Sequence, residues 1–241
     1  MQEYLKSILM RKVLLATTFV VAASIANAQA TFGIHASGIL ASGTEKYKDA
    51  NDSEENFTTD YKSRFSWKVG GVANIPVASA ISFMPQLNIL SKGGKIDEKE
   101  SLGEDFSYEV EGKVKLTYVE LPFNFVYNTS SFFVGAGPSL SFGIGGNMEG
   151  KSITNIMGDV QTDSHDMDVK FDGKKDAEDE KVHLKSMELG ANFIAGYKLP
   201  NGLFIQANYN LGLSNIDPEE GYTSKNKYFG IGIGYFFGSK K

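Results

Sequence analysis

The 241-residue chain has no cysteine, so disulfide bonds cannot stabilise it. No internal apolar run reaches the roughly 20 residues that a transmembrane helix needs. Only three histidines are present, which leaves a zinc site or a histidine-based catalytic triad poorly supplied. The formal net charge of −5 argues against a nucleic-acid partner. A chain with these absences must be held together by a sufficient core or by closed hydrogen bonding.

The N-terminus has the features of an export signal. Arg11 and Lys12 precede an apolar stretch at 13–26, and Ala26-Asn27-Ala28 fits the small-x-small cleavage rule. The stretch is too short to span a bilayer. The sequence therefore predicts a signal peptide over residues 1–28 and a mature domain over residues 29–241. Met10 is an alternative start, and a buried helix of a cytosolic protein is the competing interpretation.

Beyond residue 30, apolar residues recur with the two-residue period of β-strands. Eight segments show the alternation, and eight is an even number, as bacterial single-chain barrels require. They lie at about 32–40, 65–75, 81–89, 119–127, 132–144, 188–198, 203–213 and 229–237.

The connections between these segments alternate between short and long. Short ones follow Ile75, Tyr127 and Leu199, whereas the long polar ones cover about 41–63, 93–113, 145–185 and 216–226. Outer-membrane barrels have this asymmetry, with short periplasmic turns and long extracellular loops. The pattern predicts an all-β fold: an eight-stranded antiparallel transmembrane up-and-down β-barrel with four long external loops and both termini in the periplasm.

The alternation alone does not say which face points outward, because a soluble lipocalin-like barrel would place the apolar face inside. The second face consists mostly of Gly, Ser, Asn and Gln with few charges, which suits a narrow interior filled by its own side chains. We therefore expect the apolar face to meet lipid. Aromatic residues near the strand ends fit interfacial girdles; they are Trp67, Tyr127, Phe132, Tyr197, Tyr235 and Phe237.

Four charged residues fall on the polar face, namely Lys68, Glu120, Glu188 and Lys198. An isolated charge in the interior would be costly, so we expect the lysines to pair with the glutamates, with Gln86 and Asn124 as polar neighbours. The set is interpreted as a structural polar core. A proton or ion relay and a catalytic carboxylate pair are the alternatives.

Several short motifs resemble a known family. They are Tyr118-Val119-Glu120-Leu121-Pro122, Gly135-Ala136-Gly137-Pro138, Leu90-Ser91-Lys92-Gly93-Gly94, the stretches 196–203 and 209–216, and the closing Gly230 to Phe237. In order and spacing they resemble the PorT-like outer-membrane β-barrel domain of Bacteroidetes, over nearly the whole mature chain. The resemblance implies a porin-like barrel in the outer membrane. The namesake of the family is associated with secretion of surface proteases.

The long segment 146–184 is rich in acidic residues. We take seven of them as a candidate loop contact site, namely Asp163, Asp166, Asp168, Asp176, Glu178, Asp179 and Glu180. Calcium prefers such oxygen ligands, but the spacing does not match an EF-hand loop. A solvated, mobile surface loop is the simpler interpretation.

The sequence thus favours a non-enzymatic outer-membrane barrel, without a cofactor, that acts through its extracellular loops in surface contact or envelope structure. Its expected partners are outer-membrane lipid, the barrel-assembly machinery and an extracellular or secretion-system protein. A PorT-like accessory role in secretion or envelope assembly is the first alternative. A barrel-embedded lipid-modifying enzyme is the second, and the chain has no nucleophile motif such as G-x-S-x-G to support it.

Overall fold

The computed structural model describes residues 30–49, 56–101, 106–175 and 179–238, so the predicted signal peptide lies outside the described residues. Within these ranges, no helix is long and apolar enough to cross a membrane. The strands are β1 (Thr31–Tyr47), β2 (Phe57–Asp60), β3 (Arg64–Pro76), β4 (Ile81–Lys92), β5 (Lys95–Ser101), β6 (Phe106–Asn128), β7 (Phe132–Ile156), β8 (Asp159–Lys170), β9 (Val182–His183), β10 (Met187–Lys198), β11 (Leu203–Gly212) and β12 (Tyr222–Phe237).

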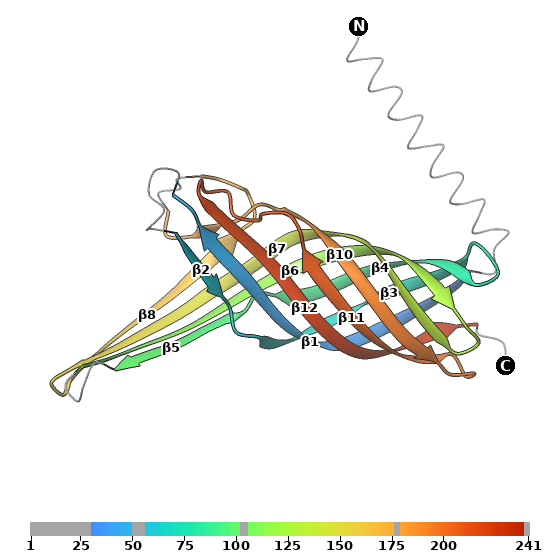
Figure 1. The fold of residues 1–241 in the computed structure, drawn as a ribbon, viewed down its shortest axis with the longest axis horizontal. Helices are drawn as coiled ribbons and strands as arrows, with labels where there is room; N and C mark the ends of the chain where they lie inside the picture. The colour runs from blue at the N-terminus through green and yellow to red at the C-terminus, as the bar shows by residue number, and fades with distance from the viewer. Residues whose placement is uncertain (1–29, 50–55, 102–105, 176–178, 239–241) are drawn as a thin grey trace, which may run out of the picture.

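Eight long strands close into a ring (Figure 1). Their order is β1-β3-β4-β6-β7-β10-β11-β12, and β12 pairs back to β1 with Phe32 opposite Phe237. Every pairing in the ring is antiparallel. The ring leaves no free edge in the wall, so all backbone polar groups there can pair. The predicted eight-stranded up-and-down barrel is confirmed.

Side chains alternate across this wall as the two-residue period requires. In β1, Phe32 and Ile34 point outward and are more than half exposed, whereas His35 and Ser37, on the alternate positions that follow, are buried. Large apolar side chains are exposed around the whole ring; Phe65, for example, is 75% exposed and Ile233 is 64% exposed. A surface in contact with water would not expose so many apolar side chains. The apolar face therefore points outward, and the lipocalin-like alternative does not hold.

The three short turns lie at the end of the ring where β1 begins and β12 ends (Figure 1). The turn after β10 contains Gly202, whose φ of 90° suits a residue without a side chain. Asn201 accepts the backbone N–H of Leu203, which fixes this turn locally. We call this end of the barrel the turn end and the opposite end the outer end.

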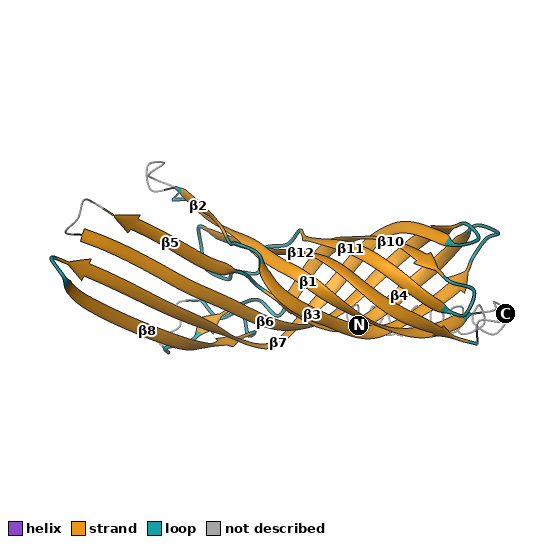
Figure 2. Cartoon of the chain, turned by 90° about the horizontal axis from the view of Figure 1, so that it is seen from below, coloured by secondary structure: helices purple, strands orange, loops and turns teal. Residues whose placement is uncertain are grey.

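Two of the predicted long loops are instead strands that extend past the outer end. β6 and β7 continue beyond the barrel, and β5 and β8 pair with their outer halves to form a four-stranded sheet that projects from the ring (Figure 2). We call this sheet the extension. The expectation of irregular loops at 93–113 and 145–185 was wrong over most of their length, because alternating residues there let neighbouring strands continue the existing ladders. Predicted loop 41–63 likewise contributes the end of β1 and β2.

Candidate functional site

An apolar cluster closes the interior near the turn end. It consists of Val72, Met84, Val126, Phe133, Ile194, Phe204 and Phe236, all buried. Interior glycines make room for these rings: a side chain at Gly234 would overlap Phe204, and one at Gly196 would overlap Phe133. These glycines thus serve the packing of the interior. We call this cluster the inner plug.

A charged cluster lies deeper toward the outer end. The Nζ atom of Lys92 is 3.1 Å from a carboxylate oxygen of Glu120 and 3.1 Å from one of Glu188, and all three side chains are almost fully buried. Tyr228 donates its hydroxyl to Glu120 at 2.6 Å, and Asn226 donates to Glu188 at 2.8 Å. One lysine between two carboxylates, with further donors on the remaining oxygens, satisfies charges that would otherwise be costly to bury.

The structure changes the expected pairing of the interior charges. Lys92 pairs with both glutamates, whereas Lys68 donates to Asn208 at 2.8 Å and Lys198 donates to Asn128 at 2.7 Å. Lys68 is buried in the middle of the barrel, whereas Lys198 sits at the turn end, too far along the barrel to reach the glutamates.

The two expected polar neighbours lie away from the charged cluster. Asn124 accepts a hydrogen bond from Asn192 at 2.8 Å, and Gln86 accepts one from Asn88 at 3.3 Å. The polar belt between the charged cluster and the inner plug therefore consists largely of amides that bond to one another. This arrangement is a filled core rather than a channel.

A second apolar cluster covers the charged cluster at the outer end, and we call it the outer plug. Its buried members are Ile39, Ala41, Leu90, Leu116, Tyr118, Val169, Leu184, Ile216 and Tyr228. Val169 belongs to β8, Leu184 follows β9, and Ile216 lies on the connection between β11 and β12. These segments are not part of the ring of eight strands, so they fold inward over its outer opening, which we call the mouth. The lumen is thus closed by apolar side chains on both sides of its polar belt.

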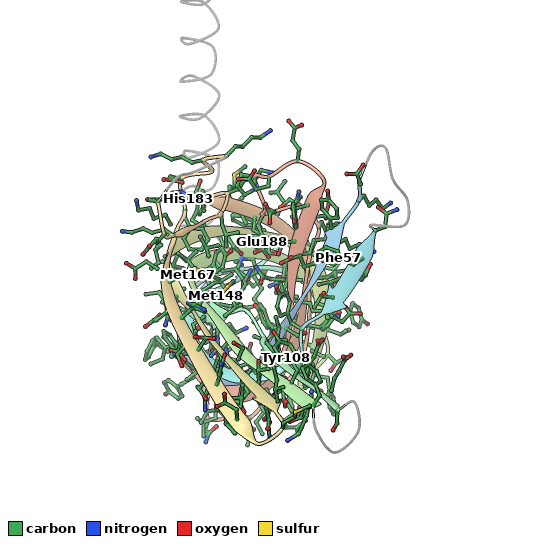
Figure 3. All side chains as sticks on the ribbon, turned by 90° about the vertical axis from the view of Figure 1, so that its left-hand side faces the viewer. Phe57, Tyr108, Met148, Met167, His183 and Glu188 are labelled. Carbon is green, nitrogen blue, oxygen red and sulfur yellow. The ribbon has the colours of Figure 1, made fainter. Side chains whose placement is uncertain are left out.

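A histidine holds the segment that carries Leu184. The two ring nitrogens of His183 lie 2.7 Å from Asp172 and 2.6 Å from Asp179, so a doubly protonated imidazolium can donate to both carboxylates. These hydrogen bonds, first that of Asp172 and then that of Asp179, raise the pKa of His183. The bond from His183, helped by Lys170, lowers the pKa of Asp179 to about 2. We call His183, which is labelled in Figure 3, together with Asp172 and Asp179 the latch.

The seven acidic residues of the predicted contact site do not form one cluster. Asp163, Asp166 and Asp168 are exposed on β8, and Asp179 belongs to the latch. Glu180, next to Asp179 in the sequence, is exposed, whereas Asp176 and Glu178 lie outside the described residues. Among the described residues, no group of three or more acidic or histidine side chains is arranged to hold a metal ion.

The extension has two unlike faces. The face that continues the barrel exterior carries rows of opposite charges, such as Lys99 with Glu109 at 3.0 Å and Lys115 with Glu149. The face that continues the interior carries Met148 and Met167, which lie side by side across β7 and β8 (Figure 3). We call these the charged face and the inner face of the extension.

Sequence reasoning missed Lys92 and the role of His183. Lys92 was grouped with the Gly93-Gly94 strand ending, although it is in phase with Leu90 and Asn88 on the inward face of β4. That phase was a usable signal. The latch depends on a contact between residues 172, 179 and 183 in an irregular segment, for which the sequence carries no period.

A closed ring of eight strands with an apolar exterior and a filled polar interior defines an integral membrane β-barrel. The chain belongs to the outer membrane protein beta-barrel domain family, whose model matches residues 23–217. Its place is accordingly the bacterial outer membrane. No curated protein sequence matches the chain.

Several solved outer-membrane proteins are similar in structure at low identity. Ail, the attachment invasion locus protein of Yersinia pestis, is 14% identical with a TM-score of 0.40, covering 86% of this chain and 99% of Ail. The outer membrane protease OmpT from Escherichia coli is 11% identical with a TM-score of 0.37, covering 88% and 97%. Neisserial surface protein A is 10% identical with a TM-score of 0.32, covering 86% and 97%.

Proposed function

We propose that this chain is a non-enzymatic surface-contact protein that acts through the extension. The observation that supports this most is the pair of plugs: the inner and outer plugs block the lumen, which leaves the outer end as the part available to a partner. The four-stranded extension is an ordered platform there, because β6 and β7 carry it directly from the barrel wall.

The buried carboxylates support a structural role rather than catalysis. Glu120 and Glu188 both bind Lys92 and are almost fully buried beneath the outer plug, so a lipid or peptide substrate has no path to them. A general acid or base must reach the substrate within hydrogen-bond distance. The proposal also includes export by the signal peptide, insertion by the barrel-assembly machinery, and short turns and both termini in the periplasm.

A PorT-like accessory role in secretion is the second candidate. The motif order described above favours it, and the long exposed edge of β8 would suit a protein partner because its outer side pairs only with the two residues of β9. Both candidates use the extension, and they differ in whether the partner belongs to the same cell.

A truncation tests the proposal. Replacing 97–111 and 151–164 each by Asn-Gly removes the outer rows of the extension in register, because Ile96 pairs with Gly112 and Gly150 pairs with His165. The truncated barrel should still show heat-modifiable migration in gels. Cells carrying it should match a deletion strain in attachment to surfaces or in the surface proteome.

The two readouts separate the candidates, since attachment reports surface contact and the surface proteome reports secretion. A truncated strain that matches the full-length strain in both would contradict the proposed function. The full chain should also give no steady conductance in planar bilayers, and an open channel would show that the plugs do not close the lumen.

A further inference from the structure

A partly enclosed cavity lies at the mouth of the barrel, between the outer plug and the root of the extension. Its volume is about 70 Å³, and its walls come from β1, β6, β7, β8, β9, β12 and the connections beside them. Leu116, Val169, Leu184 and Ile216 of the outer plug form apolar parts of the wall. None of the functions considered above uses this space, which we call the mouth cavity.

Two carboxylates line the same cavity. Glu45 lies on the inward face of β1, and Asp217 lies on the connection between β11 and β12; both are half-buried. Glu45 accepts the hydroxyl of Tyr61 at 2.8 Å, and Asp217 accepts the backbone N–H of Glu219 at 2.9 Å. Within the described part of the chain, neither carboxylate forms an ion pair.

The nearby lysines do not bind the two carboxylates directly. Lys185 donates to the backbone oxygen of Asp217 rather than to its carboxylate, and Lys225 is an exposed residue that also lines the cavity. Burial, with the charge of Glu45, raises the pKa of Asp217. Two carboxylates without a directly paired cation, beside apolar walls, are a suitable environment for a cation that carries an apolar chain.

We propose that the mouth cavity binds a small primary ammonium ion with a short apolar chain. Its ammonium group lies between Glu45 and Asp217, and its chain lies against Leu184 and Ile216. The size agrees: a water-sized group needs about 10–15 Å³ of such volume, so the cavity holds roughly five to seven non-hydrogen atoms. n-Butylammonium has five and is the probe of choice.

The cavity offers a built-in reporter. Met148 lines it, whereas Met84 lies in the inner plug and serves as a reference in the same spectrum. In methyl-labelled protein in lipid nanodiscs, n-butylammonium should shift the Met148 methyl resonance saturably and leave that of Met84 unchanged. The neutral 1-butanol and the anionic butyrate should each bind at least tenfold more weakly, because they lack the positive charge.

Variants of the two carboxylates complete the test. Glu45→Gln keeps an acceptor for Tyr61, and Asp217→Asn keeps one for the backbone of Glu219; each should weaken n-butylammonium binding about tenfold. Glu111→Gln, an exposed carboxylate on the extension, is the matched control and should bind as the unchanged protein does. Val182→Phe fills the cavity with a bulkier side chain and should abolish the shift.

The outcomes that would overturn the proposal are specific. Equal shifts by the ammonium ion, the alcohol and the carboxylate would show that only apolar partitioning occurs. Binding unaffected by Glu45→Gln, Asp217→Asn and Val182→Phe would place the ion elsewhere. Each variant is first checked for heat-modifiable migration, so that a loss of binding is read only from a folded barrel. The test does not depend on the surface contact proposed for the extension.

Discussion

β6 and β7 pass through two environments, and their two halves have opposite kinds of side chain on each face. In the barrel half, Leu121 and Phe142 point outward while Glu120 and Ser141 point inward. In the extension half, charged residues such as Lys113, Glu149 and Lys151 continue the outward face, while Val114 and Met148 continue the inward face. The change falls where the β6–β7 register shifts, between Thr117 and Tyr118.

This comparison shows that the medium, and not the fold, sets the chemistry of each face. The outward face is apolar where it meets lipid and charged where it meets water. The inward face is polar where the barrel wall screens it from lipid and apolar where the mouth segments pack on it. The level of the register shift therefore marks the expected outer boundary of the membrane, and variants on its two sides should differ in effect.

The largest effect should come from the charged cluster below this boundary. Lys92→Met leaves the carboxylates of Glu120 and Glu188 buried without their cation, which should destabilise the barrel by about 3–5 kcal/mol. Urea unfolding in lipid vesicles measures the change. Lys151→Met on the extension is the control, expected within about 0.5 kcal/mol. Similar values for the two lysines would contradict the buried pairing.

The next effect should come from the outer plug. Ile216→Ala removes a fully buried side chain whose surroundings relax only partly, so we expect a loss of about 2–4 kcal/mol in the same unfolding assay. Amide hydrogens near Leu184 should also exchange faster, because the two side chains share the plug. Ile153→Ala on the charged face of the extension is the matched control. An equal loss there would mean that the plug is not a packed core.

The sequence predicted the barrel well because lipid-facing strands carry a strict two-residue period. Phe32, Ile34 and Ile233 follow it without exception, and the interior placement of Lys68 and Glu188 follows from the same phase. The extension was missed because its strands reverse which face is polar, so a search for apolar residues on one phase stops at the boundary. The two-residue period continues in β7, where Glu149 and Lys151 alternate with Met148. Here, however, the outward residues are charged and the inward residue is apolar.

The candidate site was less predictable for a different reason. The Lys92 contacts join strands that are far apart in the chain, and a two-residue period gives the face of a residue but not its height along the barrel. The acidic residues near position 170 were grouped by closeness in sequence. The structure separates them because β8 is extended, whereas Asp172 and Asp179 return to His183 through an irregular segment.

The latch should give a pH-dependent effect of intermediate size. The folded pKa of His183 is raised, so its stabilisation is fully present below about pH 6.5 and is lost as the pH rises through the folded value. The pKa of Asp179 is lowered to about 2, so its contribution is present above about pH 4 and is lost as the pH falls toward 2. Protection of the latch segment should therefore be greatest between these limits.

Hydrogen exchange of residues 170–175 and 179–184, corrected for the intrinsic effect of pH, measures this protection. His183→Gln should lower the protection and remove its decline on the alkaline side. His165→Gln is the control, since His165 is exposed on β8 away from the latch. A decline that persists in His183→Gln would assign the titration to another group.

The smallest effect should come from the ion pairs on the charged face of the extension. Lys99 and Glu109 lie 3.0 Å apart, but the lysine side chain is 66% exposed, so water and salt screen the attraction. Lys99→Ala should cost about 0.2–1 kcal/mol, and that cost should shrink at 1 M salt. A double-mutant cycle with Glu109→Ala isolates the pair from other losses. A coupling energy as large as the destabilisation expected for Lys92→Met would mean that the extension excludes water as the barrel interior does. The contrast between the two halves of β6 would then be lost.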